Sequence, residues 1–225
     1  ITYKQHKKLH RQALELNHVA HGFEGETLFK SGEILLEAGA KVAVIGENGA
    51  GKTTFLKCLM NELTANEGVI KWSENASIGY CPQDTSADFA EDKTLFDWLS
   101  QWRMPNQDDL FVRSILGRLL FTSDEVNKSV KVCSGGEKNR LLFGKMIMQD
   151  HNVLIMDEPT NHMDMEAIEA LNLALDYYEG TLIFVSHDRE FVSSLADRIV
   201  EIKDKKLNDY QGGYEEFLAM QLAGK

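Results

Sequence analysis

The sequence predicts an α/β fold with a mostly parallel core sheet, to which an antiparallel β part and a helical part are attached. An apolar, β-branched run at 41–45 leads into the glycine-rich loop 46–54 and then into an amphipathic helix, which is the order strand, loop, helix. The apolar runs 152–156 and 181–185 each end in polar residues, as parallel strands do at a ligand-binding sheet edge. The stretch 88–130 differs, because its apolar residues recur at helical spacing.

Taken in order along the chain, the elements follow from apolar periodicity and turn residues. Helix 137–149 has a predicted N-cap at Ser134, with Glu137 at the position that completes a capping box. Within the helical insert, a stripe of tryptophan and leucine that includes Trp98 and Trp102 is typical of an internal core. The expected elements are strands 13–19 and 27–36 around a turn at 21–26, helix 53–60, strands 68–72 and 76–81, the insert, helix 137–149, strand 152–156, helix 165–179, strand 181–185, hairpin strands 199–202 and 207–210, and helix 214–222.

Length and composition are those of a globular protein. The 225 residues suffice for one large domain, and 43% hydrophobic and 9% aromatic residues are values of a folded chain. No apolar run approaches the roughly 20 residues of a membrane span, so we expect no membrane insertion. The widely spaced Cys58, Cys81 and Cys133 show no metal-ligand pattern, and Cys58 falls on an apolar helix face, which fits a reducing, cytoplasmic setting. Because the first residue is Ile1 rather than Met, we expect a piece of a longer polypeptide.

Charge is distributed unevenly along the chain. The net charge is −11, yet residues 1–14 hold four basic side chains and no acidic one, which leaves the remainder with a net charge of −15. An acidic body argues against broad nucleic-acid binding by the domain itself. The basic residues 1–12 predict the end of a linker, which either contacts phosphates or is simply solvated. We therefore divide the chain into residues 1–12 and a domain at 13–225, with a helical subdomain inserted at about 86–133.

The loop 46–54 matches the phosphate-binding pattern G-x-x-x-x-G-K-[ST]. Its glycines permit a tight curl in which backbone N–H groups point inward, and the following helix adds the partial positive charge of its N-terminus. Lys52 supplies a full charge for the outer phosphates, and the hydroxyl of Thr53 is placed to bind Mg²⁺. The motif predicts nucleotide binding by Gly46, Glu47, Asn48, Gly49, Ala50, Gly51, Lys52, Thr53 and Thr54.

Polar residues at the ends of the predicted core strands can converge on one nucleotide. Asp157 is expected to bind Mg²⁺ opposite Thr53, directly or through water. Glu158 points elsewhere and is predicted to polarise a water toward the γ-phosphate, while His187 contacts that phosphate. Gln83, at the junction with the helical insert, is predicted to reach both metal and water and so to link the γ-phosphate to movement of the insert. The predicted catalytic residues are therefore Glu158, His187 and Gln83.

Two further features indicate ligand contacts. Phe23 lies in a polar stretch and is predicted to be exposed, where it either stacks on adenine or caps the sheet as an ordinary loop aromatic. Ser134, Gly135 and Gly136 place a hydroxyl and two glycines at a helix N-terminus, which is a second anion site. Because Lys52 already serves the phosphates in its own chain, we infer that this second site binds the γ-phosphate of a nucleotide held by another copy. Two domains would then sandwich two nucleotides head to tail.

In this order the motifs resemble those of the nucleotide-binding domain of ATP-binding-cassette (ABC) proteins over nearly the whole chain. The resemblance assigns Phe23 to the aromatic loop and Gln83 to the glutamine loop. It makes Asp164 part of the inter-cassette loop and His187 the switch histidine. It implies the ABC fold, Mg²⁺-dependent ATP hydrolysis and a sandwich of paired cassettes. The signature motif falls on Ser134, Gly135, Gly136 and Glu137, after Cys133 in place of the usual leucine.

Three runs resemble sequences of the ABC-F group in particular. The run 157–164 is similar to the D-E-P-T-N-H-L-D sequence of that group, whereas transporter ATPases usually have serine-alanine in place of Asn161 and His162. The runs 186–191 and 210–214 also resemble ABC-F sequences. Members of the group are soluble proteins that carry two cassettes in one chain and act on the ribosome as translation factors or antibiotic-resistance proteins.

The resemblance implies that this chain is one cassette of such a factor, with ATP and Mg²⁺ as cofactors and a second cassette as its intramolecular partner. The basic start and the lack of an arm-like insertion between Asn61 and Gln83 favour the second, C-terminal cassette, in which the linker reaches rRNA or tRNA. One alternative is an ATPase subunit that energises a membrane transporter, against which residues 161–162 argue. The other is a cassette that holds ATP without hydrolysing it, against which the intact catalytic residues argue.

Overall fold

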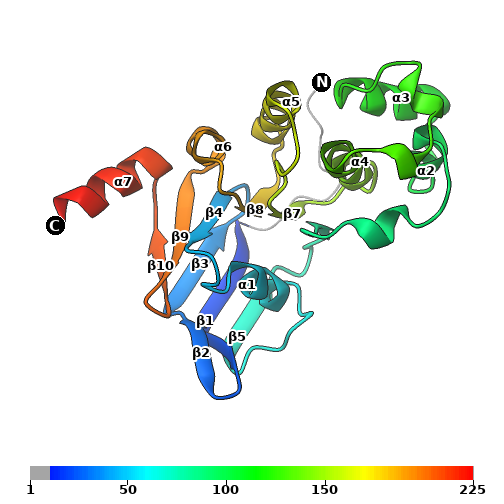
Figure 1. The fold of residues 1–225 in the computed structure, drawn as a ribbon. Coiled ribbons are helices and arrows are strands. Elements are labelled where there is room, and N and C mark those ends of the chain that lie inside the picture. Colours follow the sequence, from blue (N-terminus) through cyan, green and yellow to red (C-terminus); the bar gives the residue numbers. More distant parts are fainter. Residues whose placement is uncertain (1–10, 225) are drawn as a thin grey trace.

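The computed structural model describes residues 11–224, which form a core sheet, a second sheet packed near it and a helical part to one side (Figure 1). The core sheet has six strands in the order β10-β9-β4-β8-β7-β6. Neighbouring strands run parallel except β10, which returns antiparallel along β9. The predicted, mostly parallel core is therefore confirmed. Its strands are β4 (Lys41–Gly46), β6 (Ile78–Cys81), β7 (Val153–Asp157), β8 (Thr181–Val185), β9 (Arg198–Lys203) and β10 (Lys206–Tyr210).

The second sheet is antiparallel and has four strands arranged around β1. The predicted strand region 27–36 is too long as one unbroken element, although it follows the expected path: β2 and β3 both pair antiparallel with β1 in a single register (Ala20 with Lys30, Asn17 with Glu33), with a break at Ser31. The Ser31 hydroxyl accepts from the Val19 N–H at 3.0 Å, and the Ser31 N–H donates to the Val19 carbonyl at 2.8 Å. The predicted turn at 21–26 is also too long, since β1 continues to Phe23. The strands are β1 (Gln12–Phe23), β2 (Glu26–Lys30), β3 (Glu33–Glu37) and β5 (Glu67–Trp72).

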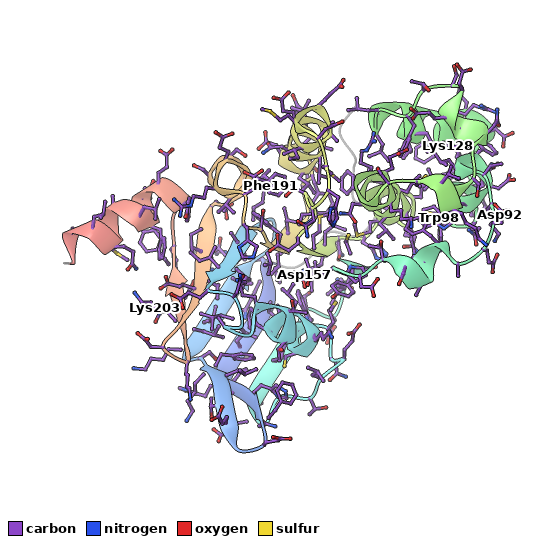
Figure 2. All side chains as sticks on the ribbon, in the orientation of Figure 1. Asp92, Trp98, Lys128, Asp157, Phe191 and Lys203 are labelled. Carbon is purple, nitrogen blue, oxygen red and sulfur yellow. The ribbon has the colours of Figure 1, made fainter. Side chains whose placement is uncertain are left out.

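The helical part lies between β6 and β7 in the sequence and to one side of the core sheet, with α4 packed against β6 (Figure 1). Its core contains Trp98, which is 2% exposed and stacks on Phe89 with ring centroids 4.6 Å apart (Figure 2). The Trp102 ring packs edge-on against the Trp98 ring, with centroids 4.4 Å apart. The tryptophan stripe is therefore an internal core, as predicted. The elements are the 3₁₀ turns η1 (Ser86–Phe89), η2 (Glu125–Asn127) and η3 (Val130–Val132), and helices α2 (Leu95–Ser100), α3 (Asp109–Arg118) and α4 (Gly135–Met148).

The remaining helices flank the core sheet, and one of them is not predicted by the sequence analysis. This helix, α6, spans seven residues, which is too short for apolar periodicity to mark it. Asp188 caps it by accepting from the Phe191 N–H at 3.1 Å, and Phe191 packs edge-on against Phe184 of β8. No helix within residues 11–224 is long and apolar enough to cross a membrane. The flanking helices are α1 (Lys52–Leu59), α5 (Met165–Asp176), α6 (Arg189–Leu195) and α7 (Tyr214–Ala223).

The three thiols lie in the protein interior. Cys58, Cys81 and Cys133 are each at most 8% exposed, which confirms the predicted core position of Cys58. Burial raises the pKa of Cys58 to about 11 and that of Cys81 to about 12. Both side chains are therefore neutral, unreactive thiols at physiological pH.

Candidate active site

The phosphate loop joins β4 to α1 at the carboxyl edge of the core sheet. Gly49 and Gly51 have left-handed φ angles of 80° and 103°, which a side chain would strain. At Gly46 a Cβ atom would lie 2.8 Å from the Ile202 carbonyl oxygen, so a close approach rather than φ requires glycine there. The first turn of α1 has neither a side-chain cap nor an acidic residue. Its free N–H groups are therefore available to an anionic ligand.

Lys52 begins α1 and points back into the loop. Its Nζ donates to the carbonyl oxygens of Gly46 at 2.5 Å and Glu47 at 3.1 Å. Burial lowers the pKa of Lys52, although the nearby carboxylates of Glu158 and Asp157 oppose that shift. The loop thus holds a nearly buried cation beside two carboxylates, and the triphosphate of a nucleotide is the chemical class of ligand that suits it.

Thr53 and Asp157 form an oxygen-rich pair at the predicted metal position. The Thr53 hydroxyl donates to Asp157 Oδ2 at 2.7 Å, which joins α1 to the end of β7. Asp157 is 2% exposed and lies near the middle of the molecule (Figure 2). Burial raises the pKa of Asp157, so a cation at this position would relieve an unfavourable buried charge. A hydroxyl and a carboxylate are hard oxygen donors, and they fit Mg²⁺.

Glu158 follows directly after β7 in a strained backbone conformation, with a φ of 52° that is uncommon for a residue with a side chain. The Glu158 N–H donates to the Val185 carbonyl at 2.9 Å, which fixes this turn against β8. Its carboxylate meets His187 twice: Oε1 lies 3.0 Å from Nε2, and Oε2 accepts from the His187 N–H at 3.3 Å. Burial raises the pKa of Glu158, with His187 opposing the shift. A buried carboxylate with a raised pKa is suited to accept a proton.

A cavity of about 310 Å³ brings the predicted catalytic and metal residues together. It lies between the start of α1, the ends of β7 and β8, and the segment that leads from β6 into the helical part. The residues that the sequence analysis expects to converge thus line one cavity, with Gln83 exposed at its rim, while their binding of one ligand stays a prediction. The lining includes Asn48, Lys52, Thr53, Thr54, Gln83, Asp157, Glu158 and His187.

A larger cavity of about 790 Å³ adjoins the other side of the phosphate loop. It extends past the start of β2 to the β9–β10 turn and α7, and it is large enough for a nucleoside. Phe23 does not line it, but Phe23 pairs across the strand with Glu26, which does. The Phe23 ring is 51% exposed, as predicted, and leans edge-on against His21 at 5.1 Å. Stacking of this ring on adenine stays a prediction.

The signature residues lie at the start of α4, away from both cavities. The predicted capping box is present: Ser134 Oγ accepts from the Glu137 N–H at 3.2 Å, and Glu137 Oε1 accepts from the Ser134 N–H at 3.3 Å. Lys128 pairs with the Glu137 carboxylate. Neither Ser134 nor Gly136 lines the nucleotide cavities of its own chain. Their predicted contact with a nucleotide therefore needs another copy, and it stays a prediction.

The structure also links the signature to the loop that follows Glu158, which the sequence analysis does not anticipate. Asn139 of α4 donates from Nδ2 to the carbonyl oxygens of Pro159 at 3.3 Å and Asn161 at 3.2 Å. The His162 ring packs closely on Gly135: a Cβ atom added at Gly135 would lie 3.1 Å from Cδ2 of that ring. The sequence signal for this contact is Asn139 itself, a polar residue on the buried stripe of α4, three positions after Gly136. Asp164, the predicted inter-cassette residue, caps α5 by accepting from the Ala167 N–H at 2.8 Å.

Comparison with known proteins identifies the family. The sequence model of the family described as "ABC transporter" matches residues 29–161, more than half of the chain. This chain belongs to the ABC transporter family. The family consists of ATP-hydrolysing domains, so the site described above is that of an ATP-binding ABC cassette.

Relatives of this cassette include proteins of the F group. The cassette is 57% identical to "Probable ATP-binding protein YbiT" of Escherichia coli O157:H7 over 97% of this chain and 41% of that protein. It is 36% identical to "ABC transporter F family member 5" of Arabidopsis thaliana over 94% of this chain and 31% of that protein. Among solved structures, cbiO1 from Clostridium perfringens matches with a TM-score of 0.76 and 21% identity over 95% of this chain and 93% of that one, which shows the fold. The chain spans less than half the length of the two sequence relatives.

Proposed function

We propose that this cassette is the second of two in an ABC-F protein, which hydrolyses ATP and closes like a clamp to regulate translation on the ribosome. The observation that carries the ATPase part is the convergence of Thr53, Asp157, Glu158 and His187 on one small cavity beside the phosphate loop. The ABC-F part is supported by the similarity to a named F family member and by the residues at 161–162. The protein would act in the cytoplasm, and the linker before the domain would contact rRNA or tRNA.

The phosphate loop performs the binding step of this proposal. The uncapped N–H groups of α1 and the Lys52 ammonium would bind the β- and γ-phosphates, which replace the loop carbonyls as partners of Nζ. Phe23 would stack on the base at the rim of the larger cavity. When bound, Mg²⁺ would neutralise charge across the β- and γ-phosphate oxygens, held by Thr53, Asp157 and Gln83.

Glu158 would act as the general base. It accepts a proton from the attacking water as the water oxygen bonds to the γ-phosphorus and the bond to the ADP oxygen breaks. His187 holds both carboxylate oxygens and would turn its ring toward the γ-phosphate when nucleotide is present. Ser134 and Gly136 of another cassette would complete the site from the opposite side. Hydrolysis would therefore require closure of the pair.

The catalytic part is tested by Glu158→Gln, which keeps the size and polarity of the side chain but removes the base. We expect ATP binding to persist and turnover to fall by at least about 100-fold, as for loss of a general base. Nucleotide binding by titration and phosphate release measure the two effects separately. Near-normal turnover would show that Glu158 is not the base.

The ribosomal part is tested with the same substitution in the two-cassette protein, because trapped ATP should hold the clamp closed. We expect this variant to cosediment with ribosomes in ATP and to release them in ADP. A Lys52→Met variant, which should bind ATP about 10- to 100-fold more weakly, is the matched control at an ATP concentration that saturates only the unsubstituted site. Normal turnover by the unsubstituted protein without any ribosome binding would contradict the ribosomal role and favour the transporter alternative.

A further inference from the structure

A row of four aromatic side chains joins the β1–β2 hairpin to the helix that follows the phosphate loop. Phe23 meets His21 edge-on, with ring centroids 5.1 Å apart. The His21 and Phe29 centroids are 6.4 Å apart, and Phe29 meets Phe55 of α1 edge-on at 5.4 Å. We call these four residues the aromatic row. Its outer member, Phe23, is 51% exposed, whereas Phe29 and Phe55 belong to one buried core.

His21 is the member of the aromatic row whose residue type needs an explanation. It is 5% exposed, and neither ring nitrogen has a hydrogen-bond partner among residues 11–224. A buried polar atom without a partner destabilises the folded state, so hydrogen bonding within the domain does not account for a histidine here. The ring instead fills the space between the exposed Phe23 and the buried Phe29, at distances that favour aromatic pairs.

The backbone next to His21 is fixed by other contacts. The Gly22 N–H donates to Asn66 Oδ1 at 2.8 Å, which ties the hairpin to the segment before β5. A Cβ atom at Gly22 would lie 1.9 Å from the Glu26 carbonyl oxygen, so the two strands approach too closely for a side chain there. The orientation of the Phe23 ring is therefore set by its own side-chain torsions and by the His21 ring that it meets.

The other end of the aromatic row lies against the phosphate loop. A Cβ atom at Gly51 would lie 3.3 Å from Cβ of Leu28 and 3.6 Å from Cδ1 of Phe29. Phe55 comes three residues after Lys52 on α1, the helix whose first turn is open to an anion. The aromatic row thus connects the loop suited to phosphate with the ring that is predicted to stack on a base.

We propose that His21 is a positioning residue for nucleotide binding, whose ring holds Phe23 in the orientation that stacks on the base. This inference rests on the proposed function, because it requires Phe23 to stack on the base while the phosphates bind at the loop. A freely rotating Phe23 ring would lose conformational entropy on stacking, whereas a ring already held by His21 loses less. Loss of the His21 ring should therefore weaken binding of the base and leave binding of the phosphates unchanged.

ADP and pyrophosphate separate these two contributions, because pyrophosphate carries no base and neither ligand is the substrate of an ATPase. Titration of the 225-residue chain with each ligand in Mg²⁺ gives both affinities. Phe23→Ala should weaken ADP binding at least about fivefold, the value of one base–aromatic stack. His21→Ala should weaken it about two- to tenfold, the range of a lost aromatic pair. Both variants should bind pyrophosphate as the unsubstituted chain does.

Two further variants exclude a merely structural effect. His21→Phe keeps an aromatic ring but has no ring nitrogens, and it should restore ADP binding. Leu36→Ala is the matched control, because it also removes a nearly buried side chain, 3% exposed, from the same sheet. Leu36 pairs with Leu14, nine positions before Phe23 on β1, so this variant should leave both affinities unchanged.

A double substitution shows whether His21 acts through Phe23. In the Phe23→Ala background, His21→Ala should cause no further loss of ADP affinity. A further loss there, or unchanged ADP binding in His21→Ala alone, would overturn the positioning role of His21. Equal losses of ADP and pyrophosphate binding in His21→Ala would also overturn it. In each of these cases a loss of ADP binding in Phe23→Ala would still support stacking on Phe23. Unchanged ADP binding in Phe23→Ala would instead show that the predicted stacking is wrong, which would overturn the role of His21 with it.

Discussion

The N-termini of α1 and α4 both carry glycines and a hydroxyl residue, yet they differ in how their N–H groups are satisfied. At α1, Gly51 offers no cap, no acidic residue occupies the first turn, and the positive Lys52 lies at the start. At α4, Ser134 and Glu137 cap each other, and Glu137 adds a negative charge that Lys128 balances. The first helix end is left open for an anion, whereas the second is already stabilised by its own side chains.

From this difference we expect the two helix N-termini to have different roles. An open, positively charged N-terminus that is buried against carboxylates gains its missing partners when a polyphosphate binds. A self-capped N-terminus folds without a ligand, so under the proposed function it would be presented on the surface until another cassette brings a phosphate to it. The comparison therefore predicts that α1 governs nucleotide affinity and that α4 governs the assembled site.

Removal of the α1 cation should have the largest effect. Lys52→Met should weaken ATP binding about 10- to 100-fold, the value of charge-assisted hydrogen bonds of about 1.5–3 kcal/mol. Burial lowers the pKa of Lys52, which means that the folded state disfavours its charged form. Removing the charge should therefore not lower the melting temperature of the domain without nucleotide. Titration with ATP and a thermal melt measure the two quantities. A fall in both together would mean that Lys52 acts mainly in folding.

The α4 end is tested by mixing two inactive chains. Ser134→Ala alters the signature and leaves the phosphate loop intact. Lys52→Met alters the phosphate loop and leaves the signature intact. If the signature acts across a dimer of this cassette, each chain alone should be inactive. An equal mixture should recover about a quarter of the unsubstituted turnover, since half of the pairs are hybrids with one intact site. The control mixes Ser134→Ala with itself. A mixture as inactive as its components would indicate that Ser134 does not serve a partner's nucleotide.

The link between the two regions is tested by Asn139→Ala. Asn139 is 8% exposed, and its loss leaves the Pro159 and Asn161 carbonyls without a donor. We expect the free energy of unfolding to fall by about 1–3 kcal/mol. Asn208→Ala on β10, where the side chain is exposed, should change it by less than about 0.5 kcal/mol. Urea unfolding of both variants provides the measurement, and equal losses would contradict a special role for Asn139.

The smallest effect concerns the pH dependence of stability at the α1 site. Burial raises the pKa of Glu158, so its protonated form is favoured in the folded state. The stability that depends on this proton is fully present below the ordinary pKa of 4.5 and is lost as pH rises through the raised value. Glu158→Gln should therefore melt a few degrees higher than the unsubstituted chain at neutral pH, with the difference vanishing in acid. Calorimetry across pH checks the sign; a less stable variant at neutral pH would contradict it.

Much of the fold could be predicted because each of its long elements carries a local pattern of apolar residues or turn residues in the sequence. The phosphate loop, the buried strands 152–156 and 181–185 and the helical stripe around Trp98 each depend on local residues alone. The division of 27–36 into β2 and β3 could not be predicted, since it depends on the Ser31 hydroxyl bonding Val19, a contact made only in the folded sheet. The short α6 carries too few residues to show a period.

The residues of the site could be predicted where the sheet topology places them, but their contacts with distant elements could not. Thr53, Asp157, Glu158 and His187 each end or begin an element at one sheet edge, so topology alone brings them together. The bond from Asn139 to Pro159 joins a helix to a loop 20 residues later and has no sequence pattern of its own. The position of Phe23 relative to a base depends on a ligand as well as on the strand that carries it.

The buried thiols have a practical consequence for measuring the proposed closure of paired cassettes. Cys58, Cys81 and Cys133 are shielded, and burial keeps their thiols protonated. A maleimide dye should therefore react with an added surface cysteine and spare the native ones. Met165→Cys, at a residue 75% exposed at the start of α5, would give a single attachment point without prior cysteine removal. Distances between dyes on paired copies of this cassette could then be followed with its three native cysteines in place.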